Sequence, residues 1–257
     1  TFVTDSLSMV SVFSIYLLVA NGVRNAVSSV TQGTQASFGD VIARGQSETL
    51  RAAFSEFQVV SYTAAAVLCS VAFVLIMPFI TLYTSGIDGV RYYYTSIGFL
   101  CIFEVLLYHL KTPQGLLVIA AGMYRETRVQ TTIQAALLLL CSIVLGLQWG
   151  VPGILAGVCI SDLYRTVDLI FFVPARITGT KPRHTIKLIG LCLLGCLITC
   201  APFMAIGVSC RNWLEWLAWG VAVGAWGLVA CFAMYALFAR TEITGLVERV
   251  KRMLHRS

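Results

Sequence analysis

The chain has 257 residues, of which 58% are hydrophobic and only 12% are charged. Soluble globular domains carry about 25% charged residues, and a core built from a chain of this length could not bury so much apolar surface. The composition therefore excludes a soluble domain and a disordered chain, and it indicates an all-α integral membrane protein. The net charge of +6 comes from basic residues between apolar runs, which favours membrane topology over nucleic-acid binding.

Seven apolar runs are long enough to cross a membrane, for which a helix needs about 20 residues. They lie at roughly 9–32, 56–80, 92–121, 128–148, 152–173, 186–207 and 214–239. The fourth and fifth runs share one charge-free stretch, which the turn-forming sequence Gln148–Gly153 divides. No signal peptide precedes the first run, and because the chain begins at Thr1 we expect a fragment of a longer protein.

The distribution of basic residues predicts the orientation of these spans. If residues 1–8 lie outside, 13 of the 18 basic residues fall in inner segments, two fall outside and three lie within spans. The positive-inside rule then predicts a cytoplasmic C-terminus. Apolar residues recur at helical spacing in the tail, 242–256. This pattern predicts an amphipathic helix on an anionic inner leaflet, with a solvated basic tail as the alternative.

The first span carries polar residues every three or four positions, which places them on one face of a helix. These residues are Asn21, Arg24, Asn25, Ser28, Gln32 and Gln35. A polar stripe is unfavourable against lipid, so it predicts the wall of a water-filled cavity, with contact between helices as the alternative. Because no acidic residue lies one turn from Arg24, we expect a carboxylate from another helix, or an anionic ligand, beside it.

The third span holds Glu104, Tyr108 and Lys111 on one face, and Pro113 is expected to bend the helix beside the lysine. This arrangement suits an element that moves or lines a substrate path. The alternatives are that Glu104 and Lys111 neutralise each other, or that the lysine extends to the membrane surface.

The fifth span contains Asp162, Arg165 and Asp168, also on one face. We interpret this group first as a local ion-pair cluster. A carboxylate that binds a proton or another coupling cation is the second interpretation, for which Glu104, Asp162 and Asp168 are the candidates.

Other motifs indicate packing rather than chemistry. Gly153-x-x-x-Gly157 and Gly220-x-x-x-Gly224 predict close helix contacts. Eight of the nine cysteines lie in apolar runs; three of them share one helix face, which we interpret as packing. These three are Cys192, Cys196 and Cys200. The sequence holds no phosphate-binding loop, zinc spacing or nucleophile motif, so we expect no enzyme, cofactor, metal or catalytic residue.

Four groups of segments follow one another along the chain in a pattern that is found in a known family. The first group is Tyr16–Leu18 (YLL) and Phe38–Ala43 (FGDVIA), followed by Glu48 and Phe54. The second is Met77–Tyr83 (MPFITLY), and the third is Lys111–Pro113 (KTP) with Ala120–Tyr124 (AAGMY). The fourth is Gly150–Ile154 (GVPGI) with Ser161 and Pro174. Together these segments resemble the second half of bacterial polysaccharide flippases of the multidrug/oligosaccharidyl-lipid/polysaccharide exporter superfamily, in which asparagine stands at the position of Asp40.

The resemblance implies the second lobe of a two-lobe transporter at 1–176, two additional membrane helices at 177–240 and a cytoplasmic tail at 241–257. The implied function is the flipping of a polyprenyl-pyrophosphate-linked oligosaccharide across the bacterial cytoplasmic membrane, with membrane lipids and polysaccharide-assembly enzymes as further partners. Arg24 and Lys111 would bind the pyrophosphate, and the amides of the first span would bind sugar hydroxyls. The alternatives are a cation-coupled drug or metabolite antiporter of the same superfamily and a membrane scaffold without transport activity.

Overall fold

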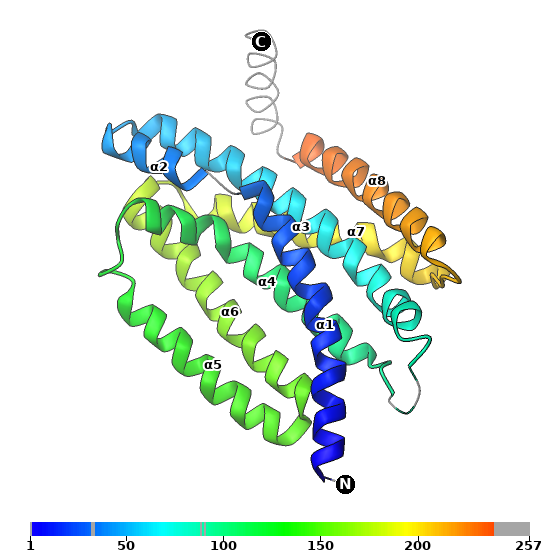
Figure 1. Ribbon diagram of the computed structural model, residues 1–257. Coiled ribbons are helices and arrows are strands. Elements are labelled where there is room, and N and C mark those ends of the chain that lie inside the picture. Colours follow the sequence, from blue (N-terminus) through cyan, green and yellow to red (C-terminus); the bar gives the residue numbers. More distant parts are fainter. Residues whose placement is uncertain (1, 32–33, 88, 90, 239–257) are drawn as a thin grey trace.

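The computed structural model describes residues 2–31, 34–87, 89 and 91–238, and these residues form helices without a strand (Figure 1). The helices are α1 (Phe2–Thr31), α2 (Thr34–Ala43), α3 (Ser47–Tyr83), α4 (Thr95–Ala120), α5 (Arg128–Trp149), α6 (Val151–Val173), a π-helix (Pro174–Thr178), α7 (Pro182–Ile206) and α8 (Trp213–Phe238). The tail predicted to form an amphipathic helix, 242–256, lies outside the described residues.

The long helices confirm the predicted all-helical fold and its apolar spans. Among the described residues, the helices α3, α4, α5, α7 and α8 and the segment Met9–Ala43 are long and apolar enough to cross a membrane. The helix α6 has 23 residues and is long enough as well, but it contains three charged side chains. These lengths and compositions are those of a multi-pass membrane protein.

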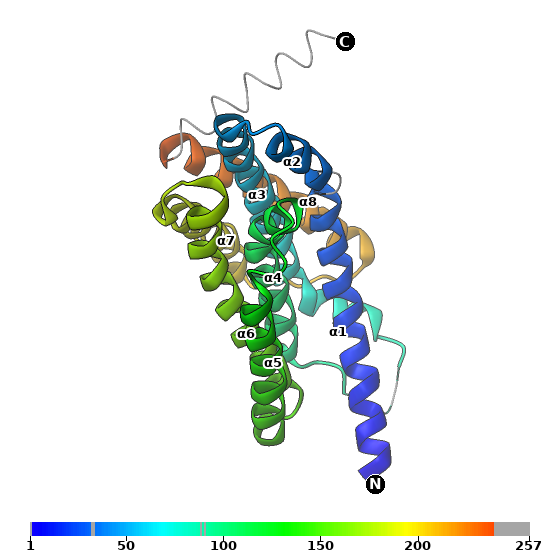
Figure 2. The ribbon, with the colours of Figure 1, turned by 90° about the vertical axis from the view of Figure 1, so that its left-hand side faces the viewer.

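The 37-residue helix α3 lies at the centre of the bundle, where α1, α4, α7 and α8 pack against it (Figures 1 and 2). The sequence places alanine, serine and cysteine along α3 where its neighbours approach. Both α7 and α8 share one core cluster with α3. The predicted boundary at residue 176 therefore marks no break in the packing.

The cysteines of α7 join it to α3. The thiols of Cys192, Cys196 and Cys200 lie 3.4, 3.6 and 3.8 Å from successive backbone carbonyl oxygens of α3 and donate to them. The acceptors belong to Tyr62, Ala66 and Ser70. Because both sets of residues are spaced by four, the contacts repeat once per turn. This arrangement confirms that the three cysteines serve packing.

The helices α5 and α6 form a tight antiparallel hairpin at the edge of the bundle (Figure 1). They are joined by Gly150, whose φ of +63° is accessible to glycine at little cost, within the predicted turn. A Cβ atom at Gly153 would overlap the backbone of Leu145, and one at Gly157 would overlap that of Ser142. The motif Gly153-x-x-x-Gly157 thus allows close contact between the backbones of α5 and α6, as predicted. At Gly220 and Gly224, in contrast, a Cβ atom would meet only side chains at ordinary distances, so this motif allows no such backbone contact.

Basic residues gather at the end of the bundle where α3 and α7 begin. Arg51 of α3 donates from Nε to the carbonyl oxygen of Thr178, at 2.6 Å. Beside it, Arg176 shares a small pocket with the turn between α2 and α3 and with the end of α4. This end, which we call the α2 end, is the side predicted to be cytoplasmic.

Candidate functional site

Among the described residues, three ion pairs with largely buried side chains lie within the helix bundle. The first joins α1 to α4, with Arg24 Nη2 at 2.5 Å from Glu104 Oε2. The Glu104 side chain is 12% exposed and that of Arg24 is 32% exposed. Of the two alternatives that the sequence left open for Arg24, a carboxylate from another helix is the one observed.

The second ion pair joins α4 to α6, between Lys111 Nζ and Asp162 Oδ1. Gln134 of α5 also donates to Asp162 Oδ1, from its Nε2 at 3.3 Å. Mutual neutralisation of Glu104 and Lys111 is therefore wrong, as is extension of the lysine to the membrane surface. The two residues share a face of α4, but each lies nearer to a group on a neighbouring helix.

The third ion pair lies within α6, where Arg165 Nη1 donates to Asp168 Oδ2 at 2.7 Å. The predicted cluster of three charges on α6 is thus divided, because Asp162 binds Lys111 instead.

The Tyr108 ring lies between the basic side chains of the first two pairs. The centre of its ring lies 4.9 Å from the Arg24 guanidinium carbon and 5.1 Å from Lys111 Nζ, distances at which a cation is attracted to an aromatic face.

An open cavity of about 360 Å³, lined by both polar and apolar side chains, lies between α4, α5 and α6 beside these pairs. Both Lys111 and Arg165 line it, so two cations border one space. Its other lining residues are Tyr108, Thr112, Gly115, Leu116, Val118, Ile119, Tyr124, Thr127, Thr131, Gln134 and Leu169. Hydroxyl and amide groups can donate and accept hydrogen bonds, so the cavity can hold a polar group that carries negative charge.

The α5 side of this cavity was missed by the sequence analysis. Thr131 and Gln134 lie in a charge-free run, which we treated only as a span. Together with Thr127 they follow the spacing i, i+4 and i+7. The same spacing identified the polar face of the first span, so the signal was present.

The predicted polar stripe of α1 is exposed in this chain. Asn21 and Asn25 are exposed, whereas Ser28 is half-buried, so the described chain covers the stripe only in part. The stripe does not continue as one helix face, because the exposed Gln35 lies on α2, which turns away from α1 (Figures 1 and 2). Gln32 lies outside the described residues. The stripe can face water or a further polar surface.

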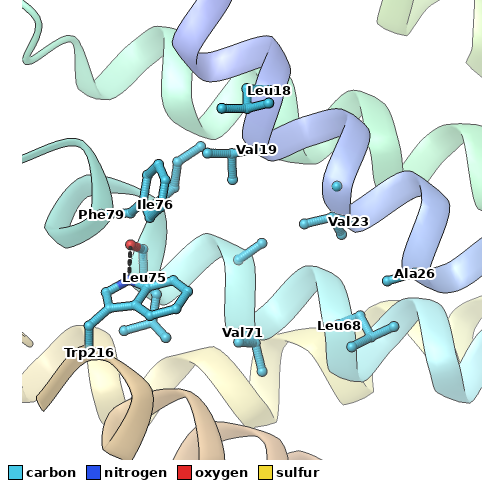
Figure 3. Close-up of a pocket in the computed structure, with 12 residues that line it drawn as sticks. Leu18, Val19, Val23, Ala26, Leu68, Val71, Leu75, Ile76, Phe79 and Trp216 are labelled. Atoms are coloured by element: carbon cyan, nitrogen blue, oxygen red, sulfur yellow. Dashed lines mark hydrogen bonds between the residues drawn. The ribbon is translucent and has the colours of Figure 1, made fainter. Parts of the chain in front are cut away.

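An apolar groove of about 330 Å³ lies between α1 and α3 and ends at α8 (Figure 3). Its lining residues are Leu18, Val19, Gly22, Val23, Ala26, Leu68, Val71, Ala72, Leu75, Ile76, Phe79 and Trp216. The indole N–H of Trp216 donates to the carbonyl oxygen of Leu75 at 3.2 Å (Figure 3), so the single polar group of this side chain is satisfied. The groove therefore offers a hydrocarbon surface, whereas the cavity adds basic, hydroxyl and amide groups to its apolar lining.

The described residues contain no group of three histidine, cysteine, aspartate or glutamate side chains that could hold a metal ion. No family model matches this chain, and neither a curated protein nor a solved structure matches it. Its function therefore has to be argued from the geometry of the bundle.

Proposed function

We propose that this chain forms part of a flippase that moves a polyprenyl-pyrophosphate-linked oligosaccharide, or a polysaccharide repeat unit, across the bacterial cytoplasmic membrane. The observation that carries this proposal is the cavity between α4, α5 and α6, which two basic side chains, Lys111 and Arg165, line among apolar helices. Ionisable side chains inside a membrane domain are costly, and they usually mark a substrate or ion pathway. The segment resemblance described above favours the same class of transporter.

The cavity suits the pyrophosphate and the sugar next to it. Charge-assisted hydrogen bonds between basic side chains and phosphate are strong and short, and Thr131 and Gln134 supply groups for sugar hydroxyls. Without cargo, Lys111 is neutralised by Asp162. When an anion enters, the lysine can turn to it while Asp162 keeps its hydrogen bond from Gln134, so no carboxylate is left without a donor.

The apolar groove suits the polyprenyl tail of the same cargo. It is lined by apolar side chains from three helices (Figure 3), and one of these helices, α1, also carries the Arg24 that pairs with Glu104 of α4. A lipid-linked sugar needs both kinds of surface, because its head is hydrophilic and its tail is hydrocarbon. Access would alternate as this bundle rocks against a partner lobe.

A cation-coupled antiporter of the same superfamily is the second candidate. The observation that favours it is that Arg24, Lys111 and Arg165 each have a carboxylate partner among the described residues, so a cation could displace one of them. In that case Glu104, Asp162 or Asp168 would bind the coupling ion. The third candidate, a scaffold, predicts that Asn21 and Ser28 are inaccessible to water in the membrane.

The flippase proposal predicts that transport needs the charges of the cavity. We expect vesicles that contain the full-length protein to translocate a fluorescent polyprenyl-pyrophosphate oligosaccharide. The double variant Lys111→Met/Asp162→Asn removes a buried pair together, which stability tolerates better than the loss of one partner, and we expect it to fold but to lose translocation. The matched control Asp40→Asn/Arg44→Gln removes an exposed pair and should translocate normally.

The results separate the candidates. Normal translocation by Lys111→Met/Asp162→Asn would exclude the cavity as the cargo site. The antiporter would be favoured if the unmodified protein exchanged a small substrate for a cation and did not move the lipid-linked sugar. In that case Glu104→Gln should stop the exchange.

The proposed orientation predicts which loops are accessible from outside the cell. Ser85 follows the C-terminal end of α3, whereas Thr180 lies at the α2 end. In a Cys210→Ser background, we expect Ser85→Cys to react with an impermeant thiol reagent on intact cells and Thr180→Cys to react only after permeabilisation. Labelling of Thr180→Cys in intact cells would reverse the orientation.

A further inference from the structure

Polar side chains from α3 and α7 meet in steps that lead inward from the α2 end. At the entrance, Ser55 Oγ lies 3.4 Å from His184 Nε2, and both residues are half-buried. One helical turn deeper, Gln58 donates from Nε2 to Thr185 Oγ1 at 3.4 Å, and both residues are buried. The polar contacts therefore continue from the surface into the interior.

The next step reaches α4 beside Pro113. Gln114 donates from Nε2 to the Tyr62 hydroxyl at 2.7 Å, and this hydroxyl donates to the carbonyl oxygen of Leu110 at 3.1 Å. Pro113 has no N–H, so the carbonyl of His109 lacks its usual helical donor. We call Ser55, Gln58, Tyr62, Gln114, His184 and Thr185 the polar file.

Buried polar atoms without a hydrogen-bond partner lie at the inner end of this file and on the helices that form it. Among the described residues, Gln114 Oε1, His109 Nε2 and Ser61 Oγ have no partner, although their residues are only 1%, 2% and 3% exposed. Each such atom destabilises a fold by about 1–3 kcal/mol. Buried polar atoms in folded proteins are satisfied by protein groups or by internal water, and a hydrocarbon environment makes this requirement stricter.

We propose that water enters the bundle along the polar file and binds beside Pro113, where proline is expected to bend α4 and where Gln114 Oε1 accepts a hydrogen bond from it. The file supplies donors and acceptors at each step, as a chain of water molecules requires. The water at its end solvates the His109 carbonyl that the proline leaves without a helical donor, so α4 can change its angle at this proline without breaking buried hydrogen bonds. The inference does not depend on the identity of the cargo.

Hydrogen exchange tests this proposal on the intact protein in lipid nanodiscs. We expect backbone amides in peptides that cover 110–120 to exchange about tenfold faster than those that cover 66–76 in the middle of α3, because water reaches only the former. Gln114→Met has a similar volume but no amide, and it should slow exchange at 110–120 by about fivefold while the bend at Pro113 is retained.

Three further variants serve as controls. Gln114→Asn keeps an amide and should keep fast exchange. Gln58→Met removes an amide nearer the entrance and should slow exchange in the same peptides, which provides a second test if Gln114→Met fails to fold. Ser70→Ala removes a buried hydroxyl that bonds within its own helix and should change nothing. Equal protection of 110–120 and 66–76 in the unmodified protein, or unchanged exchange in the folded methionine variants, would overturn the proposal.

Discussion

The Arg24→Ala variant is expected to lower the free energy of unfolding by about 2–4 kcal/mol, because it leaves the Glu104 carboxylate unpaired inside the bundle. Loss of one partner from a fully buried pair is typically worth about 3–5 kcal/mol. The expected value is lower here because the Arg24 side chain is 32% exposed. Chemical unfolding in nanodiscs measures the loss, and protein abundance in the membrane should fall with it.

A double-mutant cycle separates the ion pair from other effects. In a Glu104→Gln background, Arg24→Ala should be much less destabilising, because a neutral amide does not need the guanidinium. Arg24→Lys should retain part of the stability, since it keeps the charge but loses the planar fork.

The exposed pair of Arg44 and Asp40 provides the control for this cycle. The two side chains are 64% and 59% exposed, so Arg44→Ala should change stability by only about 0–0.5 kcal/mol. An Arg24→Ala protein as stable as its parent, with no coupling to Glu104, would show that the guanidinium is not committed to this carboxylate, and binding of an anion would again be the better explanation.

The Gly153→Ala variant is expected to be destabilised by about 2–4 kcal/mol, at or above the usual range for overpacking, because its methyl group would meet backbone rather than a movable side chain. The carbonyl of Leu145 occupies that space, so α5 must move away from α6. Because α5 packs against the bundle mainly through α6, this movement should also widen the cavity between α4, α5 and α6. Chemical unfolding in nanodiscs measures the loss of stability.

The control for this substitution is Gly190→Ala in α7. A Cβ atom there meets nothing within 4 Å, so the change should stabilise the protein by about 0.5–1 kcal/mol, as alanine usually does relative to glycine within a helix. Equal effects of the two substitutions would mean that α5 and α6 are not in backbone contact in the membrane.

The sequence predicted the number and positions of the long helices because uninterrupted apolar length is a strong signal. Helix α3 begins at Ser47, nine residues before the predicted span. Its extra turns carry charges that a hydropathy criterion rejects, yet they pack against α2, where Phe38 meets Phe54 and Phe57 edge to face. Such contacts join residues of two different helices and could not be predicted from one apolar run.

The candidate site was predicted in part. The positions of Arg24, Glu104, Lys111 and Asp162 within spans marked them as a group that needs partners, but the sequence could not assign the partners. Spacing along the sequence shows only which residues share a face of one helix. The partners of the ion pairs lie on different helices, and their distances depend on how the helices pack. Gln134 escaped notice because a neutral amide hardly alters the hydropathy of its span, although it contributes to the same carboxylate.

The pairing of three basic with three acidic side chains has an electrical consequence. A unit charge that crosses a membrane potential of 100 mV changes its free energy by about 2.3 kcal/mol, but these six groups have no net formal charge. A movement of α1, α4 and α6 that carries the groups together through the membrane field is therefore neither driven nor opposed by the potential. Any current that accompanies the movement would report the charge of the molecule in the cavity.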